Sequence, residues 1–149
     1  NFQNSKLESE MYLETNTYIQ QSAIIARAMM DDILTYKFDA ALNWKRIIYP
    51  SDLTACGPGS GEGYPGYNDM DDFHGAVFRS PPAGQTPSHI PPVLWGTEGY
   101  TVRVLVEYVN PDDPNVKSWS RTFAKRVNVV VENEFSEQTF SIQNVECYY

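Results

Sequence analysis

A chain of 149 residues has the usual size of a single domain and can bury a hydrophobic core of its own. Hydrophobic residues make up 42% of it, and its formal net charge of −8 disfavours nucleic acid or an anionic membrane surface as a partner. Residues 1–149 contain no run of about eighteen apolar residues, so we expect no membrane-spanning helix among them.

The segment from Leu7 to Lys37 predicts one long amphipathic helix. It contains neither Pro nor Gly, and Ser5 followed by Glu8 fits a capping box, so the predicted helix spans residues 5–37. Apolar or small side chains recur every three or four residues, which places them on one helical face. These positions are Met11, Thr15, Tyr18, Ser22, Ile25, Met29, Ile33 and Tyr36.

The two halves of this predicted helix differ in polarity. From Ser22 to Met30 apolar side chains cover more of the circumference than they do from Leu7 to Gln21. We therefore expect the second half to pack on the rest of the chain, through Ile25, Met29 and Ile33. The first half is expected to protrude.

Residues 50–99 are predicted to be a long irregular region. They hold most of the glycines and prolines, and such a long stretch without periodicity is typical of a functional or packed excursion. Its aromatic side chains favour packing on the domain over a free linker. Residues 43–49 before it are predicted to form a short strand that stops at Pro50. Within the irregular region, residues 76–78 and 93–95 resemble strands.

After Gly99 the hydrophobic period changes to two, which predicts an antiparallel sheet over residues 100–149. Strands are expected at residues 100–109, 119–132 and 139–148, with a strong turn at residues 110–115. In the second strand one phase holds Phe123, Lys125, Val127, Val129 and Val131.

Such a meander has one face to cover, and the apolar half of the helix is the only candidate of adequate length. The sequence therefore predicts an α+β fold for a single domain spanning residues 1–149: one long helix packed on an antiparallel meander sheet, with an irregular region between them.

Three acidic residues, Asp69, Asp71 and Asp72, concentrate carboxylate oxygens in one glycine-flanked loop. A hard cation such as Ca²⁺ needs several such oxygens, so a calcium site is one interpretation, although the spacing is not that of an EF-hand. The alternative is a turn in which the carboxylates cap backbone N–H groups.

The two cysteines, Cys56 and Cys147, are either unrelated thiols or a disulfide pair. A bridge would close a loop of roughly 90 residues and contribute on the order of 4 kcal/mol. The absence of a CxxC motif and of any Cys/His cluster disfavours zinc and thiol redox chemistry. His74, beside the acidic residues, is either half of an acid–base pair or an ordinary loop histidine. No nucleophile motif accompanies it, so we expect no enzymatic activity.

Three stretches resemble proteins of the type IV pilin and pseudopilin superfamily, minor-pilin-like proteins in particular. Ala23–Asp39 (AIIARAMMDDILTYKFD) looks like the membrane-distal half of the pilin helix and its exit. Asn68–Gly75 (NDMDDFHG) is similar to the Asp-rich loop of such proteins. Phe123–Val131 (FAKRVNVVV) is similar to their strand of alternating valines.

The resemblance implies a non-catalytic structural subunit of a pilus or pseudopilus that serves adhesion, motility or secretion. Its partners would be other pilin subunits. It would be periplasmic or at the cell surface, and anchored before assembly in the inner membrane. Family members have a short leader and roughly twenty apolar residues for this, which we expect ahead of Asn1 in the complete protein. Some pseudopilins of this fold hold calcium in a loop, the only cofactor that the resemblance suggests.

The alternative function is a secreted or surface binding module. Its aromatic loops, with Tyr64, Tyr67 and Tyr100, would recognise a glycan or a protein. Tyrosine suits such a surface because it supplies a large contact area at low entropic cost. Packing of the irregular region explains the same residues.

Overall fold

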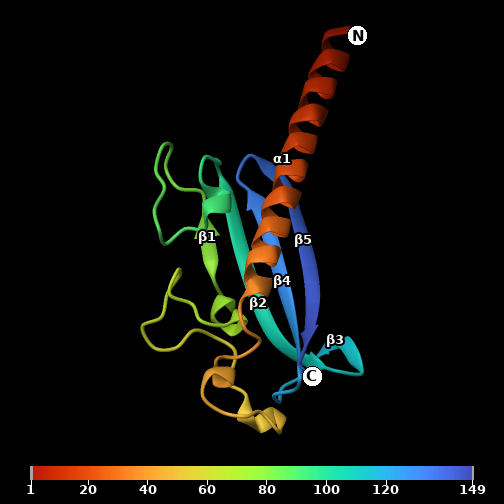
Figure 1. Cartoon of the computed structure of the whole chain (residues 1–149). Helices are drawn as coiled ribbons and strands as arrows, with labels where there is room; N and C mark the ends of the chain where they lie inside the picture. The colour runs from red at the N-terminus through yellow and green to blue at the C-terminus, as the bar shows by residue number, and fades with distance from the viewer. Residues whose placement is uncertain (1, 149) are drawn as a thin grey trace.

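The computed structural model describes residues 2–148, apart from the side chains of residue 2 and residues 12–15. One long helix, α1 (Phe2–Thr35), lies on a five-stranded antiparallel sheet (Figure 1). The predicted α+β fold is confirmed, and a single long N-terminal helix on an antiparallel sheet is a pilin-like arrangement. Within the described residues, no helix has both the length and the apolar character that crossing a bilayer requires.

The two halves of α1 differ in burial, as their polarity predicts. Its second half crosses β4 and β5 and buries Ile25, Met29 and Ile33, each no more than 1% exposed. Its first half extends beyond the end of the sheet (Figure 1), and there Leu7 and Met11 are 58% and 68% exposed. The helix begins three residues before the predicted start and ends two residues before the predicted end.

The sheet has the strand order β1-β2-β4-β5, and β3 pairs with the end of β2 as a short hairpin arm. Strands β2, β4 and β5 form the predicted meander, paired antiparallel in sequence order. The prediction missed β3, because its residues belong to a segment rich in turn-forming Asn, Pro and Asp. The strands are β1 (Val77–Arg79), β2 (Tyr100–Asn110), β3 (Asp113–Lys117), β4 (Ala124–Asn133) and β5 (Ser136–Cys147).

The core lies between α1 and one face of the sheet. Strands β2 and β4 alternate along their length, so one face of each presents valines that are at most 2% exposed. The opposite face carries charges, among them Glu107, which pairs with Arg126 at 3.1 Å and with Lys117 at 2.8 Å. The buried valines are Val102, Val104, Val106, Val127, Val129 and Val131.

Two short strands that the sequence predicts are absent. Residues 43–49 begin with the last residue of a 3₁₀ helix, η1 (Ala40–Asn43), and belong to no strand. Residues 93–95 overlap another 3₁₀ helix, η4 (Pro92–Leu94), because the prolines there lack the N–H that a strand ladder needs and suit the first helical turn. Two further 3₁₀ helices interrupt the irregular region, η2 (Pro50–Asp52) and η3 (Met70–Phe73).

Aromatic side chains fix the irregular region to the rest of the chain. Tyr64 and Tyr67 both contact the buried ring of Phe73, with ring centroids 6.3 and 4.9 Å apart, and Tyr36 at the end of α1 contacts it at 5.0 Å. Tyr100 is only 6% exposed. Tyr64, Tyr67 and Tyr100 therefore all take part in the packing of the domain.

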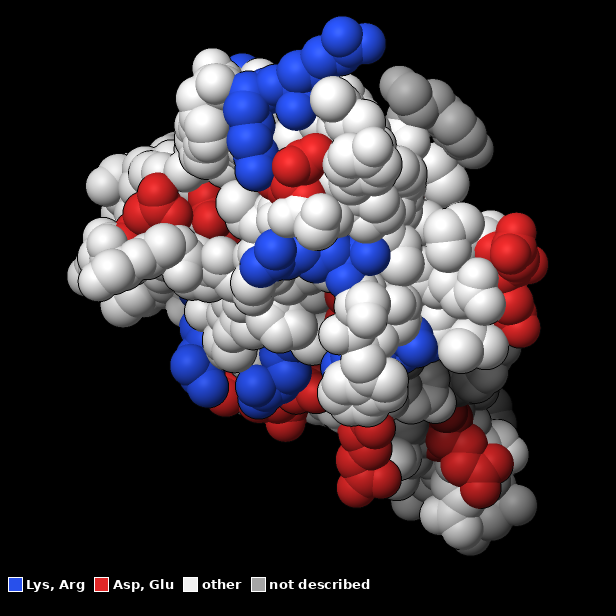
Figure 2. Space-filling model, turned by 90° about the horizontal axis from the view of Figure 1, so that it is seen from below, with Lys and Arg blue, Asp and Glu red and all other residues white. Residues whose placement is uncertain are grey.

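The end of the molecule away from the projecting helix carries both signs of charge. Figure 2 shows basic and acidic side chains interspersed there with uncharged surface, without a continuous field of one sign. Net charge alone therefore does not describe this face.

Candidate functional site

A buried lysine lies at the centre of a cluster of polar side chains. Lys125 has the same phase on β4 as the buried valines, so its side chain points into the core and is 0% exposed. A buried ammonium is unfavourable unless it is paired and hydrogen-bonded. We define the lysine centre as Lys125, its contacts Phe38, Asp39, Asp71 and Tyr108, and Thr54, which bonds Asp39.

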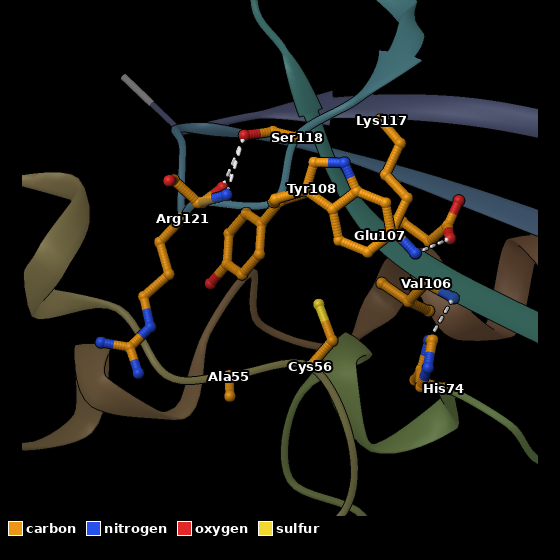
Figure 3. A pocket seen from close by; sticks show the side chains of 11 residues that line it. Ala55, Cys56, His74, Val106, Glu107, Tyr108, Lys117, Ser118 and Arg121 are labelled. Carbon is orange, nitrogen blue, oxygen red and sulfur yellow. Dashed lines mark hydrogen bonds and ion pairs between the residues drawn. The ribbon is translucent and has the colours of Figure 1, made fainter.

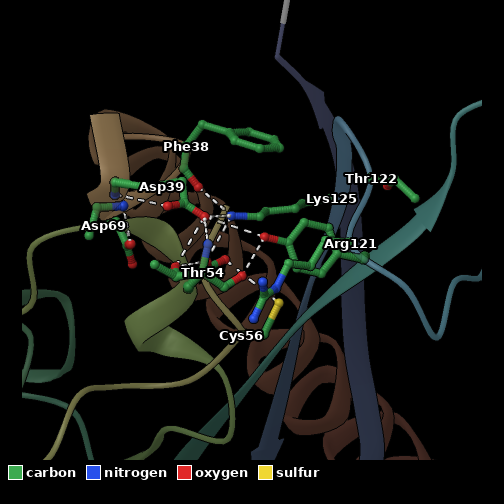
Figure 4. Close-up of polar contacts among 12 residues, drawn as sticks. Phe38, Asp39, Thr54, Cys56, Asp69, Arg121, Thr122 and Lys125 are labelled. Carbon is green, nitrogen blue, oxygen red and sulfur yellow. Dashed lines mark hydrogen bonds and ion pairs between the residues drawn. The ribbon is translucent and has the colours of Figure 1, made fainter. Parts of the chain in front are cut away.

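The ammonium group of Lys125 has three hydrogen-bonding partners, which matches its three N–H donors. Nζ donates to Asp71 Oδ2 at 2.7 Å, to the carbonyl oxygen of Phe38 at 2.6 Å and to Asp39 Oδ2 at 3.3 Å. In Figure 4 the side chain reaches from the sheet toward Phe38 and Asp39, just beyond the end of α1. The group is therefore fully satisfied within the protein.

Two aromatic rings also pack against the ammonium group of Lys125. Its Nζ lies 4.2 Å from the ring centroid of Phe38 and 4.9 Å from that of Tyr108. Both distances fall within the range of a cation–π interaction. The rings keep the amine and its carboxylate partners away from water.

Asp39 is held by donors from several elements. Its Oδ1 accepts from the N–H of Ala41 at 2.9 Å, which caps η1, and its Oδ2 accepts from the N–H of Thr54 at 2.9 Å. The hydroxyl of Tyr108 donates to the carbonyl oxygen of Thr54 at 2.7 Å and lies 3.3 Å from the same Oδ2. Burial acts to raise the pKa of Asp39. The two backbone donors and Lys125 outweigh burial and hold that pKa below its usual value.

Asp71 is the other carboxylate on Lys125, and its electrostatic balance is the opposite. Burial raises the pKa of Asp71 to about 7, although the contact with Lys125 acts to lower it. The hydroxyl of Thr54 lies 3.4 Å from its Oδ2, and the thiol of Cys56 lies 3.7 Å from its Oδ1. The same burial, with Asp71 adjacent, raises the pKa of Cys56 to about 12, so this thiol is a poor nucleophile.

In the acidic loop, two of the three carboxylates cap backbone N–H groups of the turn. Asp69 caps η3 by accepting from the N–H of Asp72 at 3.2 Å, and Asp72 accepts in return from the N–H groups of Asn68 at 2.7 Å and Asp69 at 3.4 Å. Asp71 points the other way, to Lys125. The candidate calcium ligands are thus not brought together, and among the described residues no group of three or more His, Cys, Asp or Glu is arranged to hold a metal ion.

The cysteines and His74 also have separate positions. Cys56 and Cys147 are both free thiols, so the disulfide that was one interpretation is not formed. Cys56 lies in the loop beside Asp71, whereas Cys147 ends β5 and is exposed. His74 accepts at Nδ1 from the N–H of Val106 at 3.2 Å, a contact that fixes the end of η3 to β2.

A surface pocket of about 390 Å³ adjoins the lysine centre. It lies between the loop around Cys56, the end of η3 and the turn that connects β3 to β4 (Figure 3). Trp119, which is 90% exposed, lines it together with Lys117, whose Nζ lies 4.6 Å from the indole centroid, and Arg121. An exposed aromatic ring beside cationic groups can stack a flat or ring-shaped ligand.

Sequence reasoning identified Asp71 as a candidate but not its partner. The signal for Lys125 was its phase, since a lysine between buried valines must itself be buried. Asp39, Thr54 and Tyr108 carried no comparable signal, because they come from a corner, a loop and a strand that only the fold brings together.

None of the protein-family models, curated proteins or solved structures compared with this chain matches it.

Proposed function

We propose that this chain is the headpiece of a non-catalytic, pilin-like filament subunit. The observation that carries the proposal is the division of α1: its second half is buried on β4 and β5, while its first half projects clear of the sheet (Figure 1). A projecting helix offers a long surface to neighbouring copies.

The projecting half has apolar side chains that the described part of the chain leaves exposed. Leu7 and Met11 are one helical turn apart on one face, and both are more than half exposed. A helix without tertiary packing is only marginally stable in water. Neighbouring helices in a filament would cover this face and remove its apolar surface from water.

In this proposal the partners are other pilin-like subunits, and the sheet and the irregular region form the outer surface of the filament. The protein would be held in the inner membrane through a segment ahead of Asn1 before it is assembled. It would then act in the periplasm or at the cell surface, in adhesion, motility or secretion.

The test places a charge on the projecting face in cells that make the complete protein. Met11→Glu should reduce incorporation into sheared surface filaments about tenfold or more, because burying an unpaired carboxylate costs well over about 1.4 kcal/mol. Ser9→Glu puts the same charge on the opposite face of the same exposed turn and should assemble normally. Circular dichroism of both variants verifies that the headpiece is folded.

Equal incorporation of the Met11→Glu and Ser9→Glu variants would overturn the proposal, as would a failure of the unchanged protein to appear in any filament fraction. Loss of assembly with Met11→Glu alone, at normal protein levels, would support it.

A second candidate function, a surface binding module, is favoured by the pocket around Trp119 rather than by the tyrosine loops. We would screen the headpiece on an array of immobilised glycans. If the pocket binds a ring-shaped ligand, Trp119→Ala should abolish the signal. Trp44→Ala removes an equally large exposed indole outside that pocket and should retain it. No binding by the unchanged headpiece would count against this function.

A further inference from the structure

The lysine centre holds an amine and a carboxyl group in the arrangement from which an amide can form. Nζ of Lys125 lies 2.7 Å from Oδ2 of Asp71, and the two side chains are 0% and 1% exposed. Both groups are held by secondary structure, Lys125 on β4 and Asp71 on η3. Fixing two reactants in contact removes most of the entropic cost of their reaction.

A second carboxylate touches the same amine. Oδ2 of Asp39 lies 3.3 Å from Nζ and is itself fully buried. The backbone N–H groups of Ala41 and Thr54 orient this carboxylate. An amine becomes nucleophilic only after it gives up a proton, and a carboxylate in contact with Nζ can accept that proton.

Water is kept away from the pair. The rings of Phe38 and Tyr108 lie over Nζ, and the hydroxyl of Thr54 lies 3.4 Å from Asp71 Oδ2, where it can donate to a departing oxygen. A site that excludes water opposes the reverse reaction, in which water hydrolyses the amide.

We propose that Lys125 and Asp71 form an intramolecular isopeptide bond, with Asp39 as the base that accepts a proton from the amine. Nζ attacks Cγ of Asp71, the new C–N bond forms and one C–O bond of the carboxyl group breaks. The ammonium loses two protons and the carboxylate loses one oxygen, so one water molecule leaves. No oxidant, cofactor or other reactant is needed.

The bond would covalently join β4 to η3, which lie 54 residues apart in the sequence. It would close that segment into a loop and restrict the unfolded chain, as a disulfide does. The inference does not depend on the proposed filament function, since it concerns only the inside of the headpiece.

The test is the mass of the folded, purified headpiece after denaturation, measured by intact mass spectrometry. We expect a mass lower by one water molecule than the sequence requires. Tryptic digestion should fail to cleave after Lys125 and should yield one branched peptide that contains both Lys125 and Asp71. The unmodified mass, with normal cleavage after Lys125, would overturn the proposal.

Two variants distinguish this isopeptide bond from other reactions that also lower the mass by one water molecule. Lys125→Arg lacks the nucleophile and should have its full sequence mass, whereas a cyclised aspartate elsewhere would lose water in this variant as well and would overturn the assignment. Asp39→Asn keeps the reacting pair but removes the base, so it should be largely uncrosslinked. Complete crosslinking of Asp39→Asn would overturn the role given to Asp39.

Discussion

The two ends of α1 differ in whether the side chains near them find partners within the protein. At the projecting end, Leu7 and Met11 expose apolar surface that none of the described residues covers. At the other end the chain leaves the helix and enters the lysine centre, where an ammonium and two carboxylates all have partners inside the protein. The first end offers a surface for another molecule, whereas the second holds this molecule together.

The largest expected effect comes from removing the cation at the buried end. Relative to the uncrosslinked chain, Lys125→Met should lower the free energy of unfolding by about 3–5 kcal/mol, because Asp39 and Asp71 lose their buried counter-charge. Lys117→Met breaks a partly exposed pair with Glu107, which keeps Arg126 as a partner, and should cost about 1 kcal/mol or less. Urea unfolding of both variants measures the difference. Equal losses would show that burial does not distinguish the two ion pairs.

The next prediction compares the same substitution, methionine to alanine, in the buried and the projecting half of α1. Met29→Ala leaves a cavity between α1 and the sheet and should lower the unfolding free energy by about 2–5 kcal/mol. Met11→Ala removes an exposed side chain from the projecting half and should change it by no more than about 0.5 kcal/mol. Thermal unfolding of both variants is the measurement, and a large loss in Met11→Ala would mean that the projecting half is packed in solution.

The third effect is a dependence of stability on pH, which Asp71 gives to chains in which its carboxyl group is not joined to Lys125. Its pKa is about 7 in the folded chain and about 3.9 in an unfolded chain, so between these values the folded state binds more protons. Its contribution to stability is therefore greatest at low pH and falls as pH rises from about 4 to 7, by up to about 4 kcal/mol.

Asp71→Asn should remove this part of the slope. Asp31→Asn, the same change at an exposed position of α1, should leave it in place. The measurement is urea unfolding at pH 5 and pH 8 for each protein. An identical slope in the uncrosslinked chain and in Asp71→Asn would contradict the pKa assigned to Asp71.

Periodicity was sufficient to predict most of the fold. The steps of three and four in α1 and the alternation in β2, β4 and β5 both reflect one buried face per element, so they are visible in the sequence. The strand predicted at residues 43–49 was wrong because a short apolar run does not reveal whether a partner strand is available. Strand β3 was missed because its Asp-Pro-Asn sequence has the composition of a turn.

The site was only partly predictable for a different reason. Three nearby aspartates look equivalent in the sequence, but η3 gives them different directions: Asp69 and Asp72 cap the turn, and Asp71 faces the core. The partners of Asp71 come from distant segments of the chain. Local spacing cannot report such contacts, because they exist only once the sheet and the irregular region have packed together.

The wide sequence separation within the lysine centre has a consequence for the order of folding. Lys125 and Phe38, which are in direct contact, lie 87 residues apart, and Tyr108 and Asp39 lie 69 apart. Contacts across such long loops form slowly, since closing the loop costs chain entropy before any contact repays it. The centre can close only after β4 has paired with β2, so amide groups of the 50–75 segment should gain protection from hydrogen exchange last during refolding.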